Sequence, residues 1–591
     1  MIDKEVARVF DRRSALFLTG GAVLTSGLIM RMLHMQLFSY KDYKKKSENN
    51  SYRVQIDMAE RGKILSRNGT PISYDASIYR IYIIPEESDN IDELVNTVAI
   101  DLGLREKSVK RIRDKIKKQP KFQPVLVSEK TRWETLARLQ AKNLPGLHVE
   151  NGYGRVYALG PAGAHIFGYV GAPQEAVANA PFFTTGITGL EKRFDDTLAG
   201  IPGQTVKITN AVGRVTGEDK TQFLPSTPGN DIKTTIDMDI QRVMYDTLTL
   251  HRAGCGVALD IKTGNILAMA STPSFDPNIF TTDDGEEYIN NLRNDYAKPF
   301  MNKVFEGLYP PGSTFKIIVA LAGLETGAIN PREKVFCPGH WDYGDRRYHC
   351  WEDKGHGKVD LAGALKHSCD IYFYQMALRI GIDAIKAMAV KLGFTEKFME
   401  DIIAREMRGV MPDRKWKEKN IGSRWVHGDT VISGIGQGFI LANCMQLAVM
   451  MARVASNKLV KPRLIDDGTR PRFEHLKLQD KNIKHVLKGL EQVLQQGGTA
   501  VGSAVNVDGK KMGGKTGTSQ VRSISKAERA SGVLTNEQLK WHMRNHGLFV
   551  GYAPLENPKY AVCVVTEHSG SSTPAARTAS AMMKALLKKG I

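Results

Sequence analysis

Ser313 and Lys316 lie three residues apart in the stretch YPPGSTFK, which ends at Lys316. Proline, glycine and serine are typical of a helix start, and serine is a favoured N-cap residue. Apolar residues then follow with helical spacing: Phe315, Ile317, Ile318, Leu321 and Leu324. Residues three apart on a helix share a face, so Lys316 can lie beside the Ser313 hydroxyl. The pattern predicts a nucleophile and its base; the alternative is a serine that only starts a helix.

A serine hydroxyl is a poor nucleophile in water and needs a base within hydrogen-bond reach. A lysine serves as a base only when it is uncharged, and burial among apolar side chains favours the uncharged amine. The apolar helix after Ser313 supplies such surroundings. The same spacing recurs at Ser523 and Lys526, but Ala527-Glu-Arg-Ala530 follows there, so we interpret Ser523 as a loop serine.

Two further triplets could complete a serine–lysine site. Ser368-Cys-Asp370 and Lys515-Thr-Gly517, the latter extended by Thr518, both follow Ser313 in the chain. The stretch GGKTGTS around Lys515 is rich in small residues, which let a strand approach a bound peptide closely. Two literal matches precede Ser313 and are set aside for that reason: Ser88-Asp-Asn90 and Lys262-Thr-Gly264.

The six cysteines fall into two groups. Three lie in apolar segments and are expected to be small buried side chains: Cys255, Cys444 and Cys563. The other three lie with a histidine between the first and second triplets: Cys337, Cys350, His356 and Cys369. Thiolates and an imidazole form a suitable zinc-ligand set, although the spacing is wider than in a zinc finger. A disulfide between two of these cysteines, or simple burial, are the alternatives.

Length and composition indicate a multidomain protein. A chain of 591 residues exceeds what one hydrophobic core normally covers, and its hydrophobic fraction of 42% is that of a globular protein. The net charge of +19 suits an anionic neighbour or simply a solvated basic surface. The sequence contains no nucleic-acid-binding module, so we expect no nucleic-acid partner.

The N-terminal segment predicts a membrane anchor. Ser14 to Met30 contains no charged residue, and apolar character resumes after Arg31 as far as Phe38. Basic residues precede this run: Lys4, Arg8, Arg12 and Arg13. Such a flank stays in the cytoplasm, which places the rest of the chain in the periplasm. We therefore predict a cytoplasmic tail over residues 1–13 and a single transmembrane anchor over residues 14–38. A cleaved signal peptide is the rival, but no small-x-small cleavage site follows.

Beyond the anchor we predict two domains, over residues 39–232 and 233–591. The first mixes β-like runs at 79–84 and 124–127 with a charged helix over 106–118, without a catalytic cluster. The second opens with apolar runs at 256–260 and 265–270, joined by Ile261-Lys-Thr-Gly264, which indicates a β-hairpin.

The triplets and further motifs together resemble the class B penicillin-binding proteins of the elongation type. In the first domain the similar stretches are Arg61–Gly69, Arg155–Tyr157, Ala164–Gly171 and Gly186–Asp195. In the second they are Ser271–Asn278, Gly434–Gly438 and Gly551–Pro554. The resemblance implies a membrane-anchored multidomain α+β protein. An elongated pedestal domain would precede an α/β penicillin-binding transpeptidase domain, whose antiparallel sheet has helices on both sides as in serine β-lactamases.

The resemblance also implies roles for the triplets in a peptidoglycan D,D-transpeptidase. Ser313 would attack the bond between two terminal D-alanines of a stem peptide, and Lys316 would accept its proton. Ser368 and Lys515 would then pass protons to the leaving amine. The substrate would contact the strand that carries Thr516, Gly517 and Thr518, together with Asp370. Most relatives have asparagine where this chain has Asp370, and an ionised carboxylate accepts hydrogen bonds but cannot donate them.

The same resemblance implies a structural zinc ion held by Cys337, Cys350, His356 and Cys369, and no organic cofactor. The implied partners are peptidoglycan stem peptides, a polytopic glycan polymerase of the rod-shape complex and other elongation-complex proteins, with β-lactams as inhibitors. No segment resembles a fused glycosyltransferase. Two other functions remain possible: a β-lactam hydrolase or sensor, and a scaffold that activates a partner polymerase.

Overall fold

The structure is a computed structural model that describes residues 4–37, 52–131, 133–173, 183–210, 215–280, 285–522, 528 and 532–591. Its contacts divide the chain into two units. The first comprises Met1–Glu60, Ala172–Phe183 and Gly200–Pro228; the second comprises Arg61–Gly171, Thr184–Ala199 and Gly229–Ile591. This division does not follow the predicted boundary after residue 232, which stays a prediction. The predicted loop serine, Ser523, lies outside the described residues.

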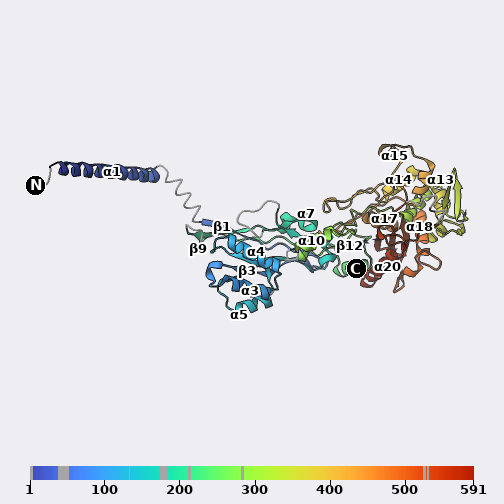
Figure 1. Ribbon diagram of the computed structural model, residues 1–591. Helices are drawn as coiled ribbons and strands as arrows, with labels where there is room; N and C mark the ends of the chain where they lie inside the picture. Colours follow the sequence, from blue (N-terminus) through green and yellow to red (C-terminus); the bar gives the residue numbers. More distant parts are fainter. Residues whose placement is uncertain are drawn as a thin grey trace. The chain divides into compact units, whose positions relative to one another are not determined.

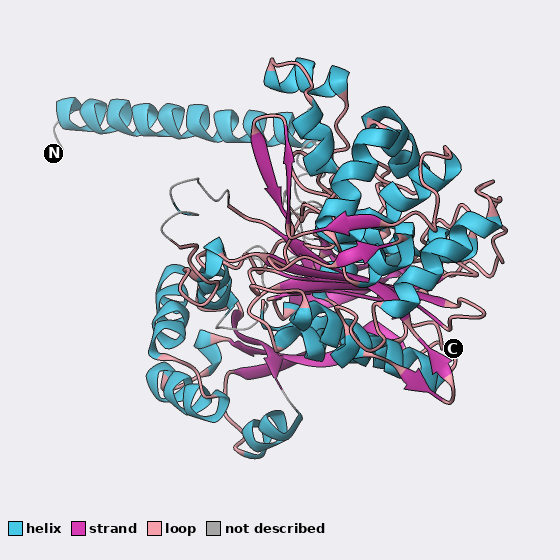
Figure 2. Cartoon of the chain, turned by 90° about the vertical axis from the view of Figure 1, so that its right-hand side faces the viewer, coloured by secondary structure: helices cyan, strands magenta, loops and turns pink. Residues whose placement is uncertain are grey.

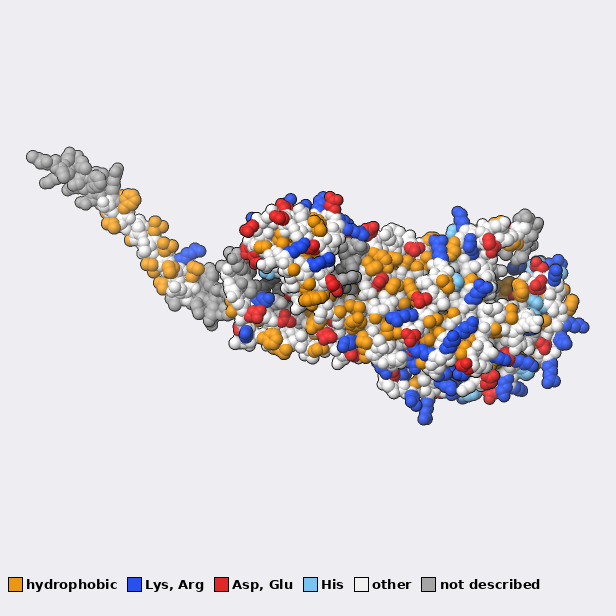
Figure 3. Space-filling model, turned by 90° about the horizontal axis from the view of Figure 1, so that it is seen from below, with side chains coloured by type: hydrophobic (Ala, Val, Ile, Leu, Met, Phe, Trp, Pro, Cys, Tyr) orange, Lys and Arg blue, Asp and Glu red, His pale blue; other side chains and the backbone are white. Residues whose placement is uncertain are grey.

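The first unit contains one long helix and a small antiparallel sheet. Helix α1 (Lys4–Leu37) includes the segment Ser14–Gln36, which has a mean hydropathy of 1.6. Within the described ranges this is the one helix long and apolar enough to cross a membrane, and its hydrophobic side chains are exposed (Figure 3). It coincides with the predicted anchor. The sheet has the order β1-β8-β9, formed by β1 (Tyr52–Asp57), β8 (Gly203–Thr209) and β9 (Val215–Leu224).

The second unit begins with a five-stranded sheet and three helices (Figure 1). The strands are β2 (Ile64–Leu65), β3 (Pro71–Ile83), β4 (Val125–Thr131), β5 (Leu147–Tyr157) and β10 (Ile232–Lys233). The helices are α3 (Ile91–Leu102), α4 (Glu106–Lys118) and α5 (Trp133–Ala141). In α4, Val109, Ile112 and Ile116 recur with helical spacing and join a small separate core with β3 and β4. The predicted helix at 106–118 and both predicted strands are confirmed.

Three of the sequence motifs of this region converge on one buried carboxylate. Glu191, in α7 (Gly189–Arg193), is completely buried. Its two carboxylate oxygens accept hydrogen bonds of 2.7 Å from Nε of Arg61 and Nε of Arg155. Asp195 pairs with Arg61 at 2.7 Å, and Asp75 pairs with Arg155 at 3.1 Å. Because each buried charge has opposite partners, this cluster fixes segments that are far apart in the chain.

A second sheet of five antiparallel strands forms the centre of the remaining part (Figure 2). Its order is β12-β11-β21-β20-β19, which makes β19 an edge strand. The strands are β11 (Gly254–Asp260), β12 (Ile266–Thr272), β19 (Gly513–Ser519), β20 (His546–Ala553) and β21 (Tyr560–Thr566). The predicted hairpin is confirmed as β11 paired with β12.

Alternate residues of this sheet enter two different cores. On β11, Val257 and Leu259 belong to the core that includes α11 (Lys316–Glu325) and α17 (Cys444–Ser456). Ala258 belongs instead to the core of α9 (Met238–Thr249) and α20 (Thr573–Lys589). Successive side chains of a strand point to opposite faces, so helices cover both faces of this sheet. This is the predicted arrangement.

The second unit has further short elements. The helices and turns are η1 (Pro85–Glu87), η2 (Gly160–Ala162), α6 (Ala164–Phe167), α8 (Asp195–Leu198), η3 (Pro277–Ile279), α10 (Gly285–Arg293), η4 (Gly312–Phe315), α12 (Leu361–Lys366), α13 (Asp370–Ile380), α14 (Ile382–Lys391), α15 (Arg414–Ile421), α16 (His427–Ser433), α18 (Asp480–Gln492), η5 (Val501–Ser503) and η6 (Trp541–Met543). The strands are β6 (Val170–Gly171), β7 (Thr185–Gly186), β13 (Val335–Cys337), β14 (His340–Tyr343), β15 (Arg346–His349), β16 (Gly357–Val359), β17 (Asn506–Val507) and β18 (Lys510–Lys511).

Candidate active site

Ser313 lies in the 3-10 turn η4, which leads directly into α11. The side chain is half-buried and makes no capping hydrogen bond, because the N-cap position of this turn is Pro311. Lys316 is the first residue of α11 and is completely buried. The predicted helix start is therefore present, but Ser313 does not act as its cap.

Glycines allow the Ser313 turn to pack against two other backbone segments. A Cβ atom on Gly312 would lie 2.5 Å from the carbonyl oxygen of Thr518 on β19. A Cβ on Gly436 would lie 2.3 Å from the carbonyl oxygen of Gly312. The N–H of Gly312 in turn donates to the carbonyl oxygen of Gly436 at 2.9 Å. Both glycines have positive φ angles, +53° and +70°. Only glycine fits such close approaches, so these positions fix Ser313 beside the edge strand.

The Lys316 amine forms a dense set of short hydrogen bonds. Its Nζ donates to the carbonyl oxygen of Ser368 at 2.8 Å, to Oγ of Ser368 at 3.3 Å and to Oδ1 of Asp370 at 2.7 Å. Among the described residues it makes no hydrogen bond to Ser313. Catalytic contacts are often long before substrate binds, so this does not exclude Lys316 as the base.

Ser368 connects the two lysines of the site. It lies between α12 and α13, and its φ of +54° is unusual for a residue with a side chain. Its Oγ accepts from Nζ of Lys515 at 2.9 Å in addition to Lys316. Strained backbone of this kind persists only where its surroundings hold it, and it concentrates at functional sites.

Asp370 begins α13 and has both carboxylate oxygens occupied. Oδ1 accepts from Lys316, and Oδ2 accepts from the backbone N–H of Trp351 at 3.0 Å. Burial raises the pKa of Asp370, and the neighbouring Lys316 charge opposes that shift. These contacts favour a role in holding Lys316, and the predicted contact of Asp370 with substrate stays a prediction.

Lys515 lies on β19 and is completely buried. Burial, and secondarily the charge of Lys316, hold the pKa of Lys515 well below its ordinary value. Besides Ser368, its Nζ donates to the carbonyl oxygen of Thr516 at 3.2 Å. A lowered pKa favours the uncharged amine, which can hydrogen-bond to the Ser368 hydroxyl and exchange a proton with it.

The edge strand β19 carries the remaining predicted substrate contacts. Thr516 Oγ1 is paired with Oγ1 of Thr499 at 2.8 Å, and the carbonyl oxygen of Thr518 accepts from Nε2 of Gln437 at 3.0 Å. Gly517 has no room for a side chain, because its Cβ would lie 2.9 Å from the Pro311 carbonyl oxygen. An edge strand has free backbone groups that can pair with an extended peptide.

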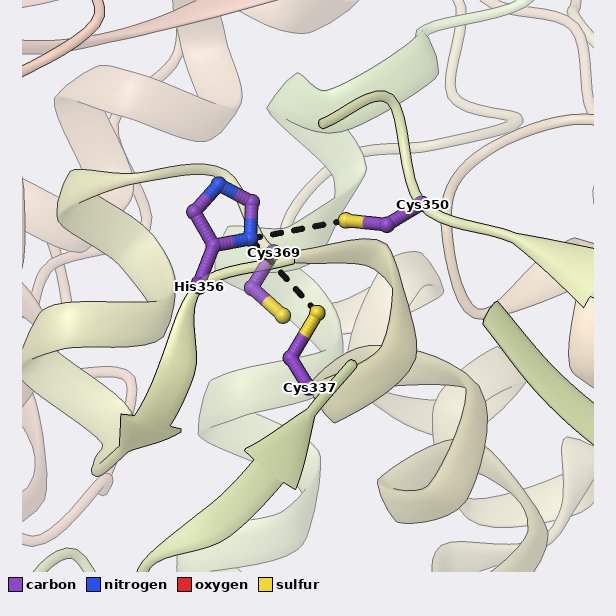
Figure 4. A group of neighbouring side chains, drawn as sticks. All are labelled: Cys337, Cys350, His356 and Cys369. Atoms are coloured by element: carbon purple, nitrogen blue, oxygen red, sulfur yellow. Dashed lines mark hydrogen bonds between the residues drawn. The ribbon is translucent and has the colours of Figure 1, made fainter. Parts of the chain in front are cut away.

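The predicted zinc ligands lie together beside this site (Figure 4). The donor atoms of Cys337, Cys350, His356 and Cys369 are all within 4.8 Å of one another. Nδ1 of His356 lies 3.7 Å from Sγ of Cys337 and 3.5 Å from Sγ of Cys350. None of the six cysteines forms a disulfide, and Cys255, Cys444 and Cys563 are buried as expected. Three sulfurs and one nitrogen at these separations suit a zinc ion.

Hydrogen bonds within the cluster favour the thiolate form of two of its cysteines. The Cys369 thiol is the main cause that lowers the pKa of Cys337 to about 6, and it also lowers that of Cys350 to about 2. The pKa of Cys369 is correspondingly raised, and the bond to Cys350 raises that of His356 to about 8. The thiolate is the form that binds a metal, so the electrostatics of the cluster also suit zinc.

The two literal motif matches have structural roles elsewhere. Lys262-Thr-Gly264 forms the turn between β11 and β12, where Oδ1 of Asp260 accepts from the N–H groups of Lys262 and Thr263. Asn90 of Ser88-Asp-Asn90 caps α3 by accepting from the N–H of Glu93.

Three contacting residues were missed in the sequence. Trp351 binds the loop that holds Ser368, Gln437 binds β19, and Thr499 binds Thr516. Gln437 lies within the stretch GIGQG that resembles the family, and Trp351 directly follows the predicted zinc ligand Cys350. Their neighbours in the sequence could therefore have indicated that both residues lie near the site. Thr499 has no such signal.

Comparison with known proteins identifies the family. Residues 254–588 match the penicillin binding protein transpeptidase domain, and residues 56–234 match the penicillin-binding protein dimerisation domain. The first match alone covers more than half of the chain. The chain therefore belongs to the penicillin-binding proteins with a transpeptidase domain. Its relatives, described next, identify it as a peptidoglycan D,D-transpeptidase.

Relatives align over almost the whole chain. It is 30% identical to the peptidoglycan D,D-transpeptidase MrdA of Haemophilus influenzae, over 97% of this chain and 91% of that protein. It is 29% identical to MrdA of Escherichia coli K12, over 95% and 92%.

Solved structures of penicillin-binding protein 2 (PBP2) have the same fold. PBP2 of Pseudomonas aeruginosa in complex with WCK 5153 is 30% identical, with a TM-score of 0.64 over 90% of this chain and 97% of that chain. PBP2 of Helicobacter pylori in complex with MreC is 24% identical, with a TM-score of 0.74 over 91% and 99%.

The glycine contacts predict that Gly436→Ala slows acylation by a fluorescent penicillin by on the order of tenfold or more, because the new Cβ displaces the Ser313 turn. The matched control is Gly468→Ala. Gly468 has a similar φ of +77° but no atom within 4 Å of its Cβ position, so it carries the backbone strain alone. Equal acylation rates for the two variants would contradict the steric explanation.

Proposed function

We propose that this chain cross-links peptidoglycan stem peptides during lateral wall elongation through an acyl-enzyme on Ser313. The observation that carries the proposal is the buried hydrogen-bonded chain from Lys316 through Ser368 to Lys515, beside the Ser313 turn. Relatives aligned over nearly the whole chain are named transpeptidases, which favours cross-linking over a β-lactam hydrolase or sensor.

Lys316 is the base in this proposal. An uncharged lysine amine has two N–H donors and one lone pair. The carbonyl oxygen of Ser368 and Oδ1 of Asp370 are the two nearest acceptors, at 2.8 and 2.7 Å, which leaves the lone pair to receive the Ser313 proton. The Asp370 carboxylate then stabilises the ammonium that this transfer creates, since the pair is buried.

Ser368 and Lys515 complete the proton transfer. As the acyl-enzyme forms, the bond between the two D-alanines breaks and the departing amine needs a proton. The Ser368 hydroxyl can supply it while it takes back the proton that Lys316 accepted from Ser313, because the Lys316 amine lies 3.3 Å from its oxygen. The Lys515 amine, 2.9 Å from the same oxygen, holds the hydroxyl in place during this transfer. The amine of a neighbouring stem peptide then takes the acyl group and restores Ser313.

The edge strand binds the donor peptide in this proposal. An extended stem peptide pairs with β19, and the hydroxyls of Thr516 and Thr518 hold its terminal carboxylate. The backbone N–H groups of Ser313 and Thr518 form the oxyanion hole, where one such donor contributes about 3–4 kcal/mol to transition-state stabilisation. β-Lactams would acylate the same serine.

Ser313→Ala should abolish labelling by a fluorescent penicillin, because it removes the hydroxyl that forms the acyl-enzyme in this proposal. Peptide mapping of the labelled wild-type protein should locate the label at Ser313. Lys316 and Lys515 contacts do not involve the Ser313 side chain, so the variant should remain folded. Labelling at Ser523, or labelling that persists in Ser313→Ala, would refute the assignment.

We further propose a structural zinc ion held by Cys337, Cys350, His356 and Cys369. When bound, it would cross-link the segments around β13, β15 and β16 with the loop that carries Ser368. The N–H of Asp370 donates to Sγ of Cys350 at 3.4 Å, so the segment from β13 to β16 (residues 335–359) has a direct contact with the triplet Ser368-Cys-Asp370.

Protein purified without a chelator should contain close to one zinc ion per chain. Cys350→Ala should lower both the zinc content and penicillin labelling, because it removes one ligand and the acceptor for Asp370 N–H. Cys444→Ala is the control, since Cys444 is a buried cysteine outside the cluster. Metal-free protein with a Cys337–Cys350 disulfide and full labelling would show that the metal assignment is wrong.

We propose that the segment before α1's apolar span is cytoplasmic and that the catalytic region is periplasmic, as the basic flank indicates. A protease added to spheroplasts should then degrade the Ser313-containing region and spare the tail; protection of that region would contradict the proposed orientation.

The Helicobacter pylori PBP2 was solved with MreC, which supports an elongation-complex partner here. We extend this proposal to a polytopic glycan polymerase of the same complex.

A further inference from the structure

Trp351 has three hydrogen bonds to the loop that contains Ser368. Its indole Nε1 donates to the carbonyl oxygens of His367 and Ser368, at 3.0 and 3.1 Å, and its backbone N–H donates to Oδ2 of Asp370. The side chain nevertheless remains 57% exposed, beside the Cys and His cluster. A tryptophan that only fills a core would be buried, so packing does not account for this placement.

The indole N–H binds at the strained point of the site. Ser368 has a φ of +54°, and its carbonyl oxygen also accepts from Nζ of Lys316 at 2.8 Å. A carbonyl oxygen has two lone pairs, so Lys316 and Trp351 together satisfy it. Without the indole donor, Lys316 would be its only partner and the peptide after Ser368 could rotate towards a less strained conformation.

We infer that Trp351 is a positioning residue for acyl transfer, acting through Ser368. Its indole N–H holds the Ser368 peptide so that Oγ lies between the two lysine amines, 3.3 Å from Lys316 and 2.9 Å from Lys515. This inference rests on the proposed function, because it assigns a role within the same serine–lysine site.

The experiment separates the N–H donor from the ring. The Trp351 ring lies 5.4 Å from the His356 ring, centroid to centroid. Trp351→Phe keeps an aromatic ring at this position and removes the N–H donor. The full chain, purified in detergent without chelator, is acylated with a fluorescent penicillin over a range of concentrations. We expect the limiting acylation rate to fall about three- to tenfold, the size of effect of one hydrogen bond, with the apparent dissociation constant unchanged.

Trp341→Phe is the matched control. Trp341 lies in β14, within the same segment 335–359, and stacks on Tyr343 at 5.0 Å, but its indole makes no hydrogen bond to a described residue. It should retain the wild-type acylation rate. Zinc content and melting temperature, measured on each protein, should be unchanged in both variants.

A second variant replaces Trp351 with benzothienylalanine, which keeps the bicyclic shape and has sulfur in place of N–H. It should reproduce the slow acylation of Trp351→Phe, whereas a wild-type rate would overturn the inference. A fall in rate that merely parallels lost zinc or a lower melting temperature would also overturn it, since that is a structural effect. If wild-type protein is not labelled at Ser313, the proposed function itself fails, and this inference fails with it.

Discussion

The site depends on the burial of two lysine amines close to one carboxylate. Lys316 and Lys515 are both completely inaccessible to solvent, and the effective penalty for burying an ion is several kcal/mol. The structure meets this constraint by pairing Lys316 with Asp370 and by holding the pKa of Lys515 well below its ordinary value through burial. Both amines also share the Ser368 hydroxyl. A dry site with one carboxylate therefore keeps amines available for proton transfer.

Holding these groups in place requires backbone conformations that most residues avoid. Gly312 and Gly436 have positive φ angles and contact each other's backbone, and Ser368 adopts a positive φ with a side chain present. For Ser368 this conformation costs about 1–3 kcal/mol and persists only when surrounding contacts over-determine it, whereas glycine adopts positive φ without that cost. Here the surroundings are α11, buried through Leu324, and the edge strand β19. The strain and the lysine burial thus depend on the same packing.

Local patterns in the sequence predicted local structure well. Helix 106–118 followed from short-range spacing, and the hairpin of β11 and β12 followed from its turn residues. Contacts that depend on tertiary packing did not. Glu191 lies far along the chain from Arg61 and from Arg155, and neither propensity nor periodicity relates such residues. Ser313 was a candidate N-cap residue in the sequence. In the structure the N-cap is Pro311, two residues earlier, whose ring fixes its φ angle.

The Cys and His cluster brings the segment 335–359 next to the loop that carries Ser368. Cys369 lies inside the second triplet, so its backbone is joined to Ser368 and to Asp370 by one peptide bond each. Cys350 also accepts the Asp370 N–H, and the next residue supplies the indole and amide donors of this loop. Ordering the segment from Cys337 to Cys369 costs conformational entropy, which weak contacts alone would have to offset. Ligation of the proposed zinc ion by all four residues would lower that entropic cost, and short strands such as β13 and β16 would then suffice to support the strained loop at Ser368.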